Sequence, residues 1–584
     1  MHLERLSKFY KNSTTKGEKM EKDFKNLNID VKGWEDLKGY YDDILKRNIN
    51  SQEDLLTLLE DFSSLSEFVS ETFGWAYINM TRDTQNKEYR DRFLVFNDEI
   101  EPKMKEISFE ILKKIVNSKY ISEIDQEKWG LLIKRFKNEV DIFRKENIPI
   151  DTEITKKTME YQQTIGSMVI KFKGKEYTLP QMSLFLQSKD RTERKEAFES
   201  LVEKRLEYSE KIENLLSELT ELRNKKAKNA NFKNYVELRF RELERFDYGV
   251  KECEEFHNSV LRIVTPIYGE IVKEKAKKLN LEKVKPYDLS ATLPDEVVLK
   301  PFENTEDFIE KSKKVFYSVD RRFGESFEKV VNNKHLDLES RKGKAPGGYN
   351  YPLYKTGLPF IFMNSSGIHS DMRTLMHETG HAVHTIAVKD LFTFFYKSTP
   401  SEVAEFASMG MELLTYDKWD IFYKDEHSLK QAKRKQLENI INFFPWCAVV
   451  DKFQHFIYSK ENISPSERKE YFKNIFNEFS EKFVDWSDYE DYMKISYHKQ
   501  LHIFEHPFYY IEYGIAQLGA LQLWINYREN PKKAIDDYLS ALNVGSSLSI
   551  SEVYKKANVK FDFSEKMMEK LINFTYDEYK KVAC

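Results

Sequence analysis

Cysteine is scarce in this sequence and cannot hold the fold together. The 584 residues include three cysteines, Cys253, Cys447 and Cys584. Because their number is odd and they lie far apart, they form neither a disulfide framework nor a zinc-finger spacing. A chain of this kind is typical of a reducing compartment, so we expect it in the cytoplasm.

The sequence also lacks long hydrophobic runs. Its N-terminal residues, MHLERLSKFYKNSTTKGEK, contain no apolar core of the kind that a secretory signal requires. The most apolar stretch, NIINFFPWCAVV, is short and is interrupted by Pro445. We therefore expect no membrane-spanning segment and no membrane partner.

Neither sign of charge is in excess. The chain carries 93 basic and 97 acidic residues, which gives a formal net charge of −4. A nucleic acid or an anionic membrane attracts a basic excess, so neither is an expected partner. With 40% hydrophobic and 33% charged residues, the composition is that of a soluble globular protein, and the length predicts more than one domain.

Helical periodicity is the commonest pattern along the sequence. In residues 50–69 apolar side chains recur at three- and four-residue steps, and Ser51 and Asp54 stand in capping positions. The same periodicity predicts one long amphipathic helix over residues 189–226. The C-terminal third of the chain is also expected to be mostly helical.

Strand signals are few. Residues Val169–Leu179 alternate around Gly174 and predict a hairpin. Residues 341–364 are rich in glycine, proline, tyrosine and phenylalanine, so we expect turns and short strands there. The fold class predicted from these patterns is mainly α, with a small β element.

Three of the twelve histidines fall within the stretch TLMHETGHAVHT, residues 374–385. Ser370 is in position to cap a helix that begins at Asp371. On that helix His377 and His381 lie four residues apart, so their side chains share one face. Two imidazoles on adjacent turns can reach the same zinc ion.

The residues between and beyond these histidines have different expected roles. Glu378 lies roughly 60–100° around the helix axis, so it can reach a water at the metal without ligating the ion, which is the H-E-x-x-H arrangement. Gly380 costs about 1 kcal/mol relative to alanine in a helix interior, which suggests a close neighbour or a substrate beside it. His384 lies roughly 10 Å along the axis from His377, so we expect it to pack or to support the ligands.

A second helix must supply the third protein ligand. Residues 398–416, STPSEVAEFASMGMELLTY, predict a helix that Ser401 caps and that carries Glu402, Glu405 and Glu412. Glu402 and Glu405 lie on roughly one face, so the residues alone do not separate them as ligands.

Six stretches of the chain then stand in a recognisable order: LQSKDRTERKEAFESL, LDLESRKGKAPGGY, PFIFMN, TLMHETGHAVH, AEFAS and HIFEHPFYYIEYGIAQLGALQLW. Together they resemble the M3 family of zinc metallopeptidases, the thimet oligopeptidase and oligoendopeptidase F group. The likeness is closest to the oligoendopeptidase F and Pz-peptidase branch and covers most of the chain. It selects Glu405, in AEFAS, as the third zinc ligand.

The resemblance also implies an architecture. It implies two helical lobes that enclose a deep substrate channel, with the small β element next to the zinc-binding helix. On this basis we expect residues 1–19 to be a loose extension, residues 20–185 an N-terminal helical domain, and residues 186–584 the catalytic metallopeptidase domain. Short peptides are the implied substrates, and folded proteins are excluded from the channel.

The C-terminal stretch concentrates histidine and tyrosine. His498, His502 and His506 step by four residues, and tyrosines follow at positions 509, 510 and 513. A zinc site that hydrolyses amides needs donors for the oxyanion. The resemblance implies that His502, Tyr509 and Tyr513 supply them. The spacing from His502 to Tyr509 differs from that of the mammalian relatives, so His506 stays an alternative, and Tyr510 is equally well a core residue.

The sequence is therefore interpreted as a zinc-dependent oligopeptidase. One zinc ion per chain is held by His377, His381 and Glu405, and Glu378 is the general base for cleavage of internal bonds in short peptides. The segment before the motif helix is expected to offer a strand edge to the peptide backbone. Two alternatives remain, namely a zinc exopeptidase with a similar site and a non-catalytic helical peptide-binding protein. The sequence does not indicate an oligomeric state.

Overall fold

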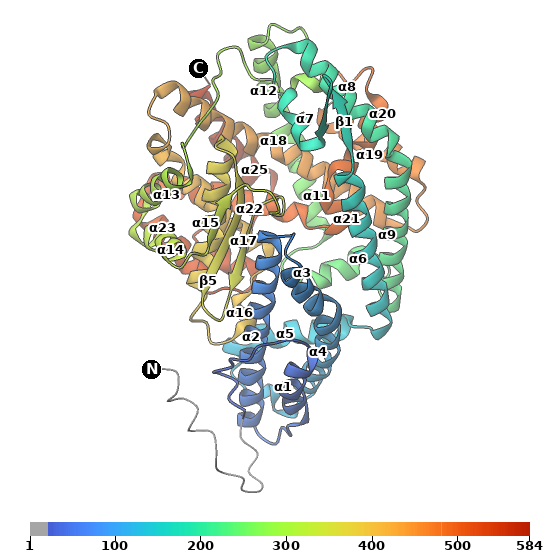
Figure 1. Ribbon diagram of the computed structural model, residues 1–584, viewed down its shortest axis with the longest axis vertical. Coiled ribbons are helices and arrows are strands. Elements are labelled where there is room, and N and C mark those ends of the chain that lie inside the picture. The colour runs from blue at the N-terminus through green and yellow to red at the C-terminus, as the bar shows by residue number, and fades with distance from the viewer. Residues whose placement is uncertain (1–21, 481, 584) are drawn as a thin grey trace.

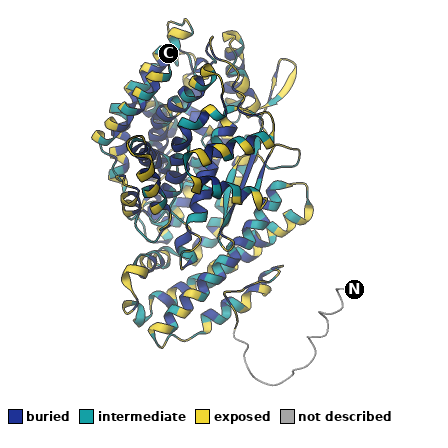
Figure 2. Ribbon diagram, turned by 90° about the vertical axis from the view of Figure 1, so that its left-hand side faces the viewer, coloured by how far each residue is buried: buried dark blue, intermediate teal, exposed yellow. Residues whose placement is uncertain are grey.

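The computed structural model describes residues 22–480 and 482–583, and these are mainly α, as predicted (Figure 1). The expected extension at residues 1–19 lies outside the described residues. Helices at the surface bury one side and expose the other, and those at the centre are buried almost throughout (Figure 2). No helix in the described part of the chain combines the length and apolarity needed to cross a membrane.

The N-terminal helices form a lobe with its own hydrophobic core, drawn in blue in Figure 1. Buried residues from Phe24 to Phe136 make up this core, and Tyr396 completes it from a later helix, α16. The helices are α1 (Trp34–Lys46), α2 (Gln52–Arg82), α3 (Lys87–Leu94), α4 (Glu101–Val116) and α5 (Gln126–Ile142). The predicted capping at the start of α2 is confirmed, because the Asp54 N–H donates to the Ser51 hydroxyl at 3.1 Å.

A second, larger core runs from Tyr161 to Tyr579. Its helices up to the sheet are α6 (Ile148–Gly166), α7 (Leu179–Phe185), α8 (Arg191–Glu207), α9 (Ser209–Asn229), α10 (Tyr235–Glu242), α11 (Val250–Ser259), α12 (Thr265–Lys278), α13 (Thr305–Val319) and α14 (Arg321–Asn332). Those after the sheet are α15 (His369–Ala387), α17 (Ser401–Thr415), α18 (Glu426–Ser459), α19 (Pro465–Ser480), α21 (Leu501–Glu505), α22 (Tyr510–Glu529), α23 (Pro531–Leu542), α24 (Ile550–Lys556) and α25 (Glu565–Val582). Helix α16 (Phe394–Lys397) belongs to the first core, and α20 (Glu490–Ile495) packs in a small separate cluster. The division of the chain at residues 185 and 186 stays a prediction.

The prediction of a single helix over residues 189–226 was wrong in one respect. The structure has two helices there, α8 and α9, which meet at Tyr208. The Ile212 N–H still bonds to the Tyr208 carbonyl at 3.1 Å, so the helical hydrogen bonding is only locally disturbed. The apolar stripe on both sides is buried as expected, but it lapses across the polar residues around Tyr208.

Helix α18 contains a proline. The helix runs from Glu426 to Ser459 and continues through Pro445. Pro445 is buried within it. A proline inside a helix removes one backbone hydrogen bond, and tertiary packing on both sides of Pro445 compensates for this loss.

The two strand regions are confirmed. Strands β1 (Val169–Phe172) and β2 (Lys175–Thr178) form an antiparallel hairpin, and Lys173 and Gly174 take positive φ angles of 48° and 78° at its turn. Adjacent positive φ angles match the right-handed twist of the paired strands.

A three-stranded sheet precedes the histidine motif. Its order is β3 (Leu336–Glu339), β5 (Leu358–Ser365) and β4 (Tyr349–Leu353), with β5 parallel to β3 and antiparallel to β4. The central strand β5 is mostly buried and leads, through Gly367 at φ 88°, into helix α15. Both β5 and β4 pack against α15, so the sheet supports the motif helix.

The first turn of α15 differs from the expected capping by Ser370. The helix begins at His369, and the carboxylate of Asp371 reaches back over the turn. One of its oxygens accepts the backbone N–H groups of Ser366, Gly367 and Ile368 at 2.7, 2.8 and 3.1 Å. A carboxylate satisfies several of the unpaired donors at a helix start and also suits the helix dipole, which explains why it replaces the serine.

Helix α17 packs between α15 and α22, in the middle of the molecule (Figure 1). It begins at Ser401, one residue after Pro400, so the expected capping by Ser401 was wrong. The close neighbour expected beside Gly380 is the backbone of α17. A Cβ atom on Gly380 would lie 2.5 Å from Ser408 Cα and 2.6 Å from the Ala407 carbonyl oxygen. Only glycine at this position allows the two helices to approach so closely.

Candidate metal centre

The structure brings together His377 and His381 of α15 and Glu405 of α17. Their ligand atoms all lie within 4.8 Å of one another. One carboxylate oxygen of Glu405, Oε2, is 3.3 Å from His377 Nε2 and 3.8 Å from His381 Nε2. The helices that supply these atoms are the two that meet at Gly380, so their contact places the third side chain opposite the first two.

A contact on the side away from Glu405 fixes the orientation of the His377 ring. Its Nδ1 lies 2.8 Å from Glu412 Oε1, and the other oxygen of Glu412 accepts the Gln436 amide N–H at 2.9 Å. A carboxylate on one ring nitrogen sets the tautomer of an imidazole that binds metal through the other nitrogen. The His377 Nε2 atom is thereby presented toward Glu405. The sequence named Glu412 as an acid of this helix but did not foresee this contact.

The donor atoms of the site fit zinc. Two imidazole nitrogens and one carboxylate oxygen are a common set for a zinc ion that keeps a position open. The three side chains are at most about one-fifth exposed, and the Glu405 carboxylate faces both imidazole rings. The described residues thus form a site with the ligand types and the burial that the ion requires.

The charge state of Glu405 suits a metal ligand. Burial alone would raise the pKa of its carboxyl, but the hydrogen bond from His377 and the charges of His377 and His381 hold the pKa at about 2. Burial lowers the pKa of His381 to about 4. A carboxylate and a neutral imidazole are the protonation states in which these residues bind metals.

Glu402, the alternative to Glu405, faces away from the histidines. Its carboxylate accepts the Tyr248 hydroxyl at 2.6 Å, and Tyr248 comes from the segment before α11. Arg245, which is buried beside it, pairs with Glu512 at 2.8 Å. The structure therefore places Glu405, and not Glu402, beside the two histidines.

Glu378 is buried next to the ligand group and is not part of it. The side-chain amide of Asn350, on strand β4, donates to the Glu378 backbone carbonyl at 3.1 Å. Burial raises the pKa of the Glu378 carboxyl to about 7, and the charges of Glu405 and Glu412 add to this shift while His377 opposes it. Glu378 thus has a buried carboxyl close to the charged ligand residues, and its backbone contacts strand β4.

His384 lies outside the ligand group, as expected. It is buried, and its Nε2 atom has no hydrogen-bond partner among the described residues. Burial lowers the pKa of its imidazole to about 3, so it packs as a neutral ring.

The tyrosine and histidine residues of the C-terminal stretch approach the same site. The Tyr509 hydroxyl donates to Glu405 Oε1 at 3.2 Å, and the rings of Tyr509 and Tyr513 lie 5.3 Å apart. Burial, helped by the charge of Glu405, raises the pKa of both phenols well above the usual value. Both therefore keep the proton that a donor needs.

His502 and His506 differ in their surroundings. The His502 ring lies 5.9 Å from Tyr509 and 5.8 Å from Tyr513, and its Nδ1 is 2.7 Å from the Gln500 amide nitrogen. The His506 ring contacts Tyr509 at 6.4 Å. Burial lowers the pKa of both imidazoles, that of His502 to about 4; the charge of Glu405 opposes the shift at His502, whereas Arg239 and Arg223 add to it at His506. Of the two, His502 is the one on the side of the ligand group.

Tyr510 and His498 belong to the packing around the site. The Tyr510 ring lies 5.6 Å from Phe443 of α18. His498 is fully buried and its Nε2 lies 2.6 Å from Glu213 Oε1. His498, His502 and His506 are evenly spaced in the sequence, but they lie in different surroundings. Only their contacts with distant parts of the chain distinguish them.

Two family descriptions match the chain. "Peptidase M3 N-terminal domain" matches residues 24–143, and "Peptidase family M3" matches residues 184–572. The second match alone spans more than half of the chain and contains every residue of the metal centre.

Individual relatives agree with this. Oligopeptidase PepF of Bacillus subtilis is 24% identical over 380 residues, which cover 64% of this chain and 55% of that protein. An oligoendopeptidase F homolog of Lactococcus lactis subsp. lactis is 22% identical over 88% of both chains. Among solved structures, Pz peptidase A with an inhibitor has 28% identity and a TM-score of 0.87, and the match covers 96% of this chain and 99% of that one. The chain thus covers little more than half of the Bacillus protein and nearly all of Pz peptidase A.

The two acids of α17 provide a matched test of the third ligand. Glu405→Gln should weaken zinc binding by more than the roughly 10- to 100-fold that loss of an outer hydrogen-bond partner costs, because an amide is a poor zinc ligand. Glu402→Gln should keep the zinc affinity within a few-fold, since its amide can still accept the Tyr248 hydroxyl. Zinc affinity is measured by competition with a chelator, and thermal unfolding checks both folds. Reversed outcomes would show that Glu402 is the ligand.

Proposed function

Because the chain belongs to peptidase family M3, we propose that it is a zinc-dependent metalloendopeptidase that hydrolyses internal bonds of short peptides. The observation that carries this proposal is the group of His377, His381 and Glu405, whose ligand atoms lie within 4.8 Å of one another. Three protein ligands leave one position open, which is typical of catalytic and not of structural zinc sites.

Zinc would be held by His377 and His381 from α15 and by Glu405 from α17. When bound, it would act as a Lewis acid that lowers the pKa of a water and polarises the carbonyl of the substrate. Glu412 would keep His377 in its binding tautomer through the 2.8 Å contact to Nδ1. Ser408, whose hydroxyl donates to Glu405 Oε2 at 3.1 Å, would steady the carboxylate.

Glu378 is the proposed general base. It follows His377 directly in the chain, is buried beside the ligand group and is not a ligand itself. Its carboxylate would take a proton from the attacking water and later give it to the leaving amine. Its position on α15, whose backbone at this residue contacts strand β4, would bring it near both the water and a peptide that lies along the strand.

The proposed oxyanion donors are Tyr509, Tyr513 and His502. As the tetrahedral centre forms, negative charge develops on the former carbonyl oxygen, and fixed donors lower its energy most in a site from which water is excluded. The Tyr509 hydroxyl, which here donates to Glu405, can exchange this bond for one to the substrate. The rings of Tyr513 and His502 both lie next to the Tyr509 ring.

Strand β4 is the proposed place for the peptide backbone. In the order β3–β5–β4 it has β5 on one side and, within the part of the chain that the structure describes, no further strand on the other. An extended peptide can add to such an edge through main-chain hydrogen bonds, which place little demand on its side chains. Asn350 of this strand already contacts the residue proposed as the base. Extended short peptides are therefore the proposed substrates.

A zinc exopeptidase with the same metal centre is the alternative enzyme. The two differ in what they require at the peptide ends: an endopeptidase cuts a peptide whose termini are both blocked, and an exopeptidase does not. The buried carboxyl of Glu378 beside a complete ligand set argues against a binding protein without activity.

Replacement of the base tests the mechanism. Glu378→Gln should keep zinc binding and lose about 10²- to 10⁴-fold in kcat/KM, the usual contribution of a general base. A peptide blocked at both ends is the substrate, and zinc content is measured on the same preparation. If the variant retains zinc and stays within a few-fold of the parent rate, Glu378 is not the base. If it loses zinc, the carboxylate ligates the ion.

Removal of single hydroxyls tests the oxyanion donors. Tyr509→Phe or Tyr513→Phe should lower kcat by about 100- to 1000-fold, with little change in KM, because the bond strengthens only as charge develops. Tyr510→Phe is the control from the same cluster and should leave kcat unchanged. His502→Ala should lower kcat and His506→Ala should not. Unchanged kcat in the Tyr509, Tyr513 and His502 variants would mean that this cluster only packs.

A further inference from the structure

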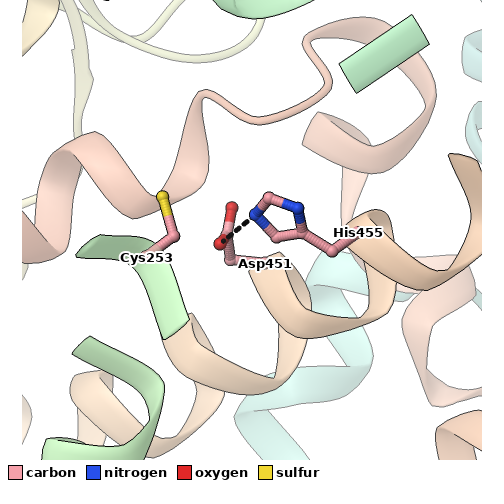
Figure 3. Close-up of side chains that lie close together, drawn as sticks. All are labelled: Cys253, Asp451 and His455. Carbon is pink, nitrogen blue, oxygen red and sulfur yellow. Dashed lines mark ion pairs between the residues drawn. The ribbon is translucent and has the colours of Figure 1, made fainter. Parts of the chain in front are cut away.

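A second group of metal-ligand side chains lies away from the proposed catalytic centre. Cys253 of α11 meets Asp451 and His455 of α18, and the sulfur, carboxylate and imidazole atoms lie within 4.8 Å of one another (Figure 3). The group is thus the second one, after His377, His381 and Glu405, in which three possible ligand atoms of the described residues come together. In Figure 3 the Asp451 carboxylate lies between the Cys253 sulfur and the His455 ring.

The spacing on the two helices explains how the group forms. Cys253 and His257 are four residues apart on α11, and Asp451 and His455 are four residues apart on α18. Each pair therefore occupies one face of its helix over adjacent turns. The two helices pack against each other, so the pairs face one another across the contact.

Asp451 is the centre of the group and is not fully satisfied. Its oxygen Oδ2 lies 2.8 Å from His257 Nε2 and 3.2 Å from His455 Nε2. The other oxygen, Oδ1, is buried and has no hydrogen-bond partner in the described chain. An unpaired buried acceptor costs about 1–3 kcal/mol, and a bound cation would remove this cost.

We propose that Cys253, Asp451 and His455 bind a divalent metal ion of the zinc class. Sulfur, nitrogen and carboxylate oxygen are all zinc ligands, and thiolate disfavours magnesium and calcium. Zinc bonds to such atoms are about 2.0–2.3 Å long, so ligand atoms that lie within 4.8 Å of one another are near enough to share one ion. His257 holds the carboxylate in place through its 2.8 Å contact to Asp451.

A bound dication would balance the charges of this group. Formation of the metal–sulfur bond would release the proton of the Cys253 thiol to solvent. A dication, a thiolate and a carboxylate with two neutral imidazoles then sum to zero charge, which suits a buried position.

The ion has a route to the group. A cavity of about 950 Å³ lies beside the group. His257 and His455 line it, together with Tyr248 and Tyr471. The bound ion would tie α11 to α18. Because the metal binds the folded chain and not the unfolded one, it would stabilise the fold by mass action. This site is additional to the single zinc ion expected from the sequence.

Cobalt distinguishes the two sites. A thiolate ligand gives Co²⁺ a sulfur-to-metal charge-transfer absorption in the near ultraviolet, and the catalytic centre contains no cysteine. The full-length chain, freed of metal by a chelator, should bind two equivalents of Co²⁺ and show this absorption. The His377→Ala/His381→Ala variant should bind one equivalent and keep the absorption, whatever its activity.

Cysteine variants identify the ligand. Cys253→Ser should lose the absorption and one equivalent of Co²⁺ and still cleave the blocked peptide at the parent rate. Cys447→Ser is the matched control, because its buried thiol donates to the Tyr510 carbonyl, and it should keep both equivalents and the absorption. If the parent chain binds one equivalent and shows no such absorption, the proposal is overturned. The same holds if Cys253→Ser leaves the absorption unchanged.

Discussion

The metal centre depends on how closely two helices approach each other at Gly380. This residue stands between the two histidines of the motif, and it faces Ala407 and Ser408, which follow Glu405 almost directly. A side chain at position 380 would collide with main-chain atoms, and these cannot rotate away. The glycine weakens α15 by about 1 kcal/mol relative to alanine, and the close packing that it permits brings Glu405 to 3.3 Å from His377.

The other parts of the site are arranged around this contact. The sheet supports one side of α15, and Asp371 fixes its first turn through three backbone N–H groups. On the other side α22 packs against α17 and brings Tyr513 toward the ligands, with Tyr509 just before its first turn. Charges in this interior are paired: Glu412 with His377, and Arg245 with Glu512 beside Glu402. An unpaired buried charge lowers the stability of the fold by several kcal/mol. These pairs therefore hold the side chains of Glu412 and Glu512 in their observed positions.

Periodicity and local chemistry predicted what depends on neighbours in the chain. The mainly α class, the hairpin at Gly174 and the start of α2 at Ser51 were of this kind, and so was the need for space at Gly380. Features that depend on distant residues were not predictable. Glu402 and Glu405 look alike on α17 until Tyr248 takes one of them, and Glu412 becomes a partner of His377 only when α15 packs beside it. Capping by Ser370 and Ser401 was predicted wrongly: the Asp371 carboxylate binds the backbone before α15, and Ser401 is already the first residue of α17. Cys253 and Asp451 lie far apart in sequence and meet only through the packing of α11 on α18.

The most direct test of this account is to add one methyl group between the helices. Gly380→Ala should force α17 back by roughly 1 Å to restore normal carbon contacts. The change should lower the free energy of unfolding by about 1–3 kcal/mol, and a misplacement of this size should lower kcat/KM about 100-fold. Gly130→Ala, in helix α5, is the control, since its Cβ would meet only the flexible Gln126 side chain, at 3.7 Å. Zinc affinity, kcat/KM and thermal unfolding are measured for both variants. Gly380→Ala should lose zinc affinity and activity, and Gly130→Ala should keep both. A Gly380→Ala chain with the parent's zinc affinity and kcat/KM would contradict the dependence of the metal centre on the close helix contact at Gly380.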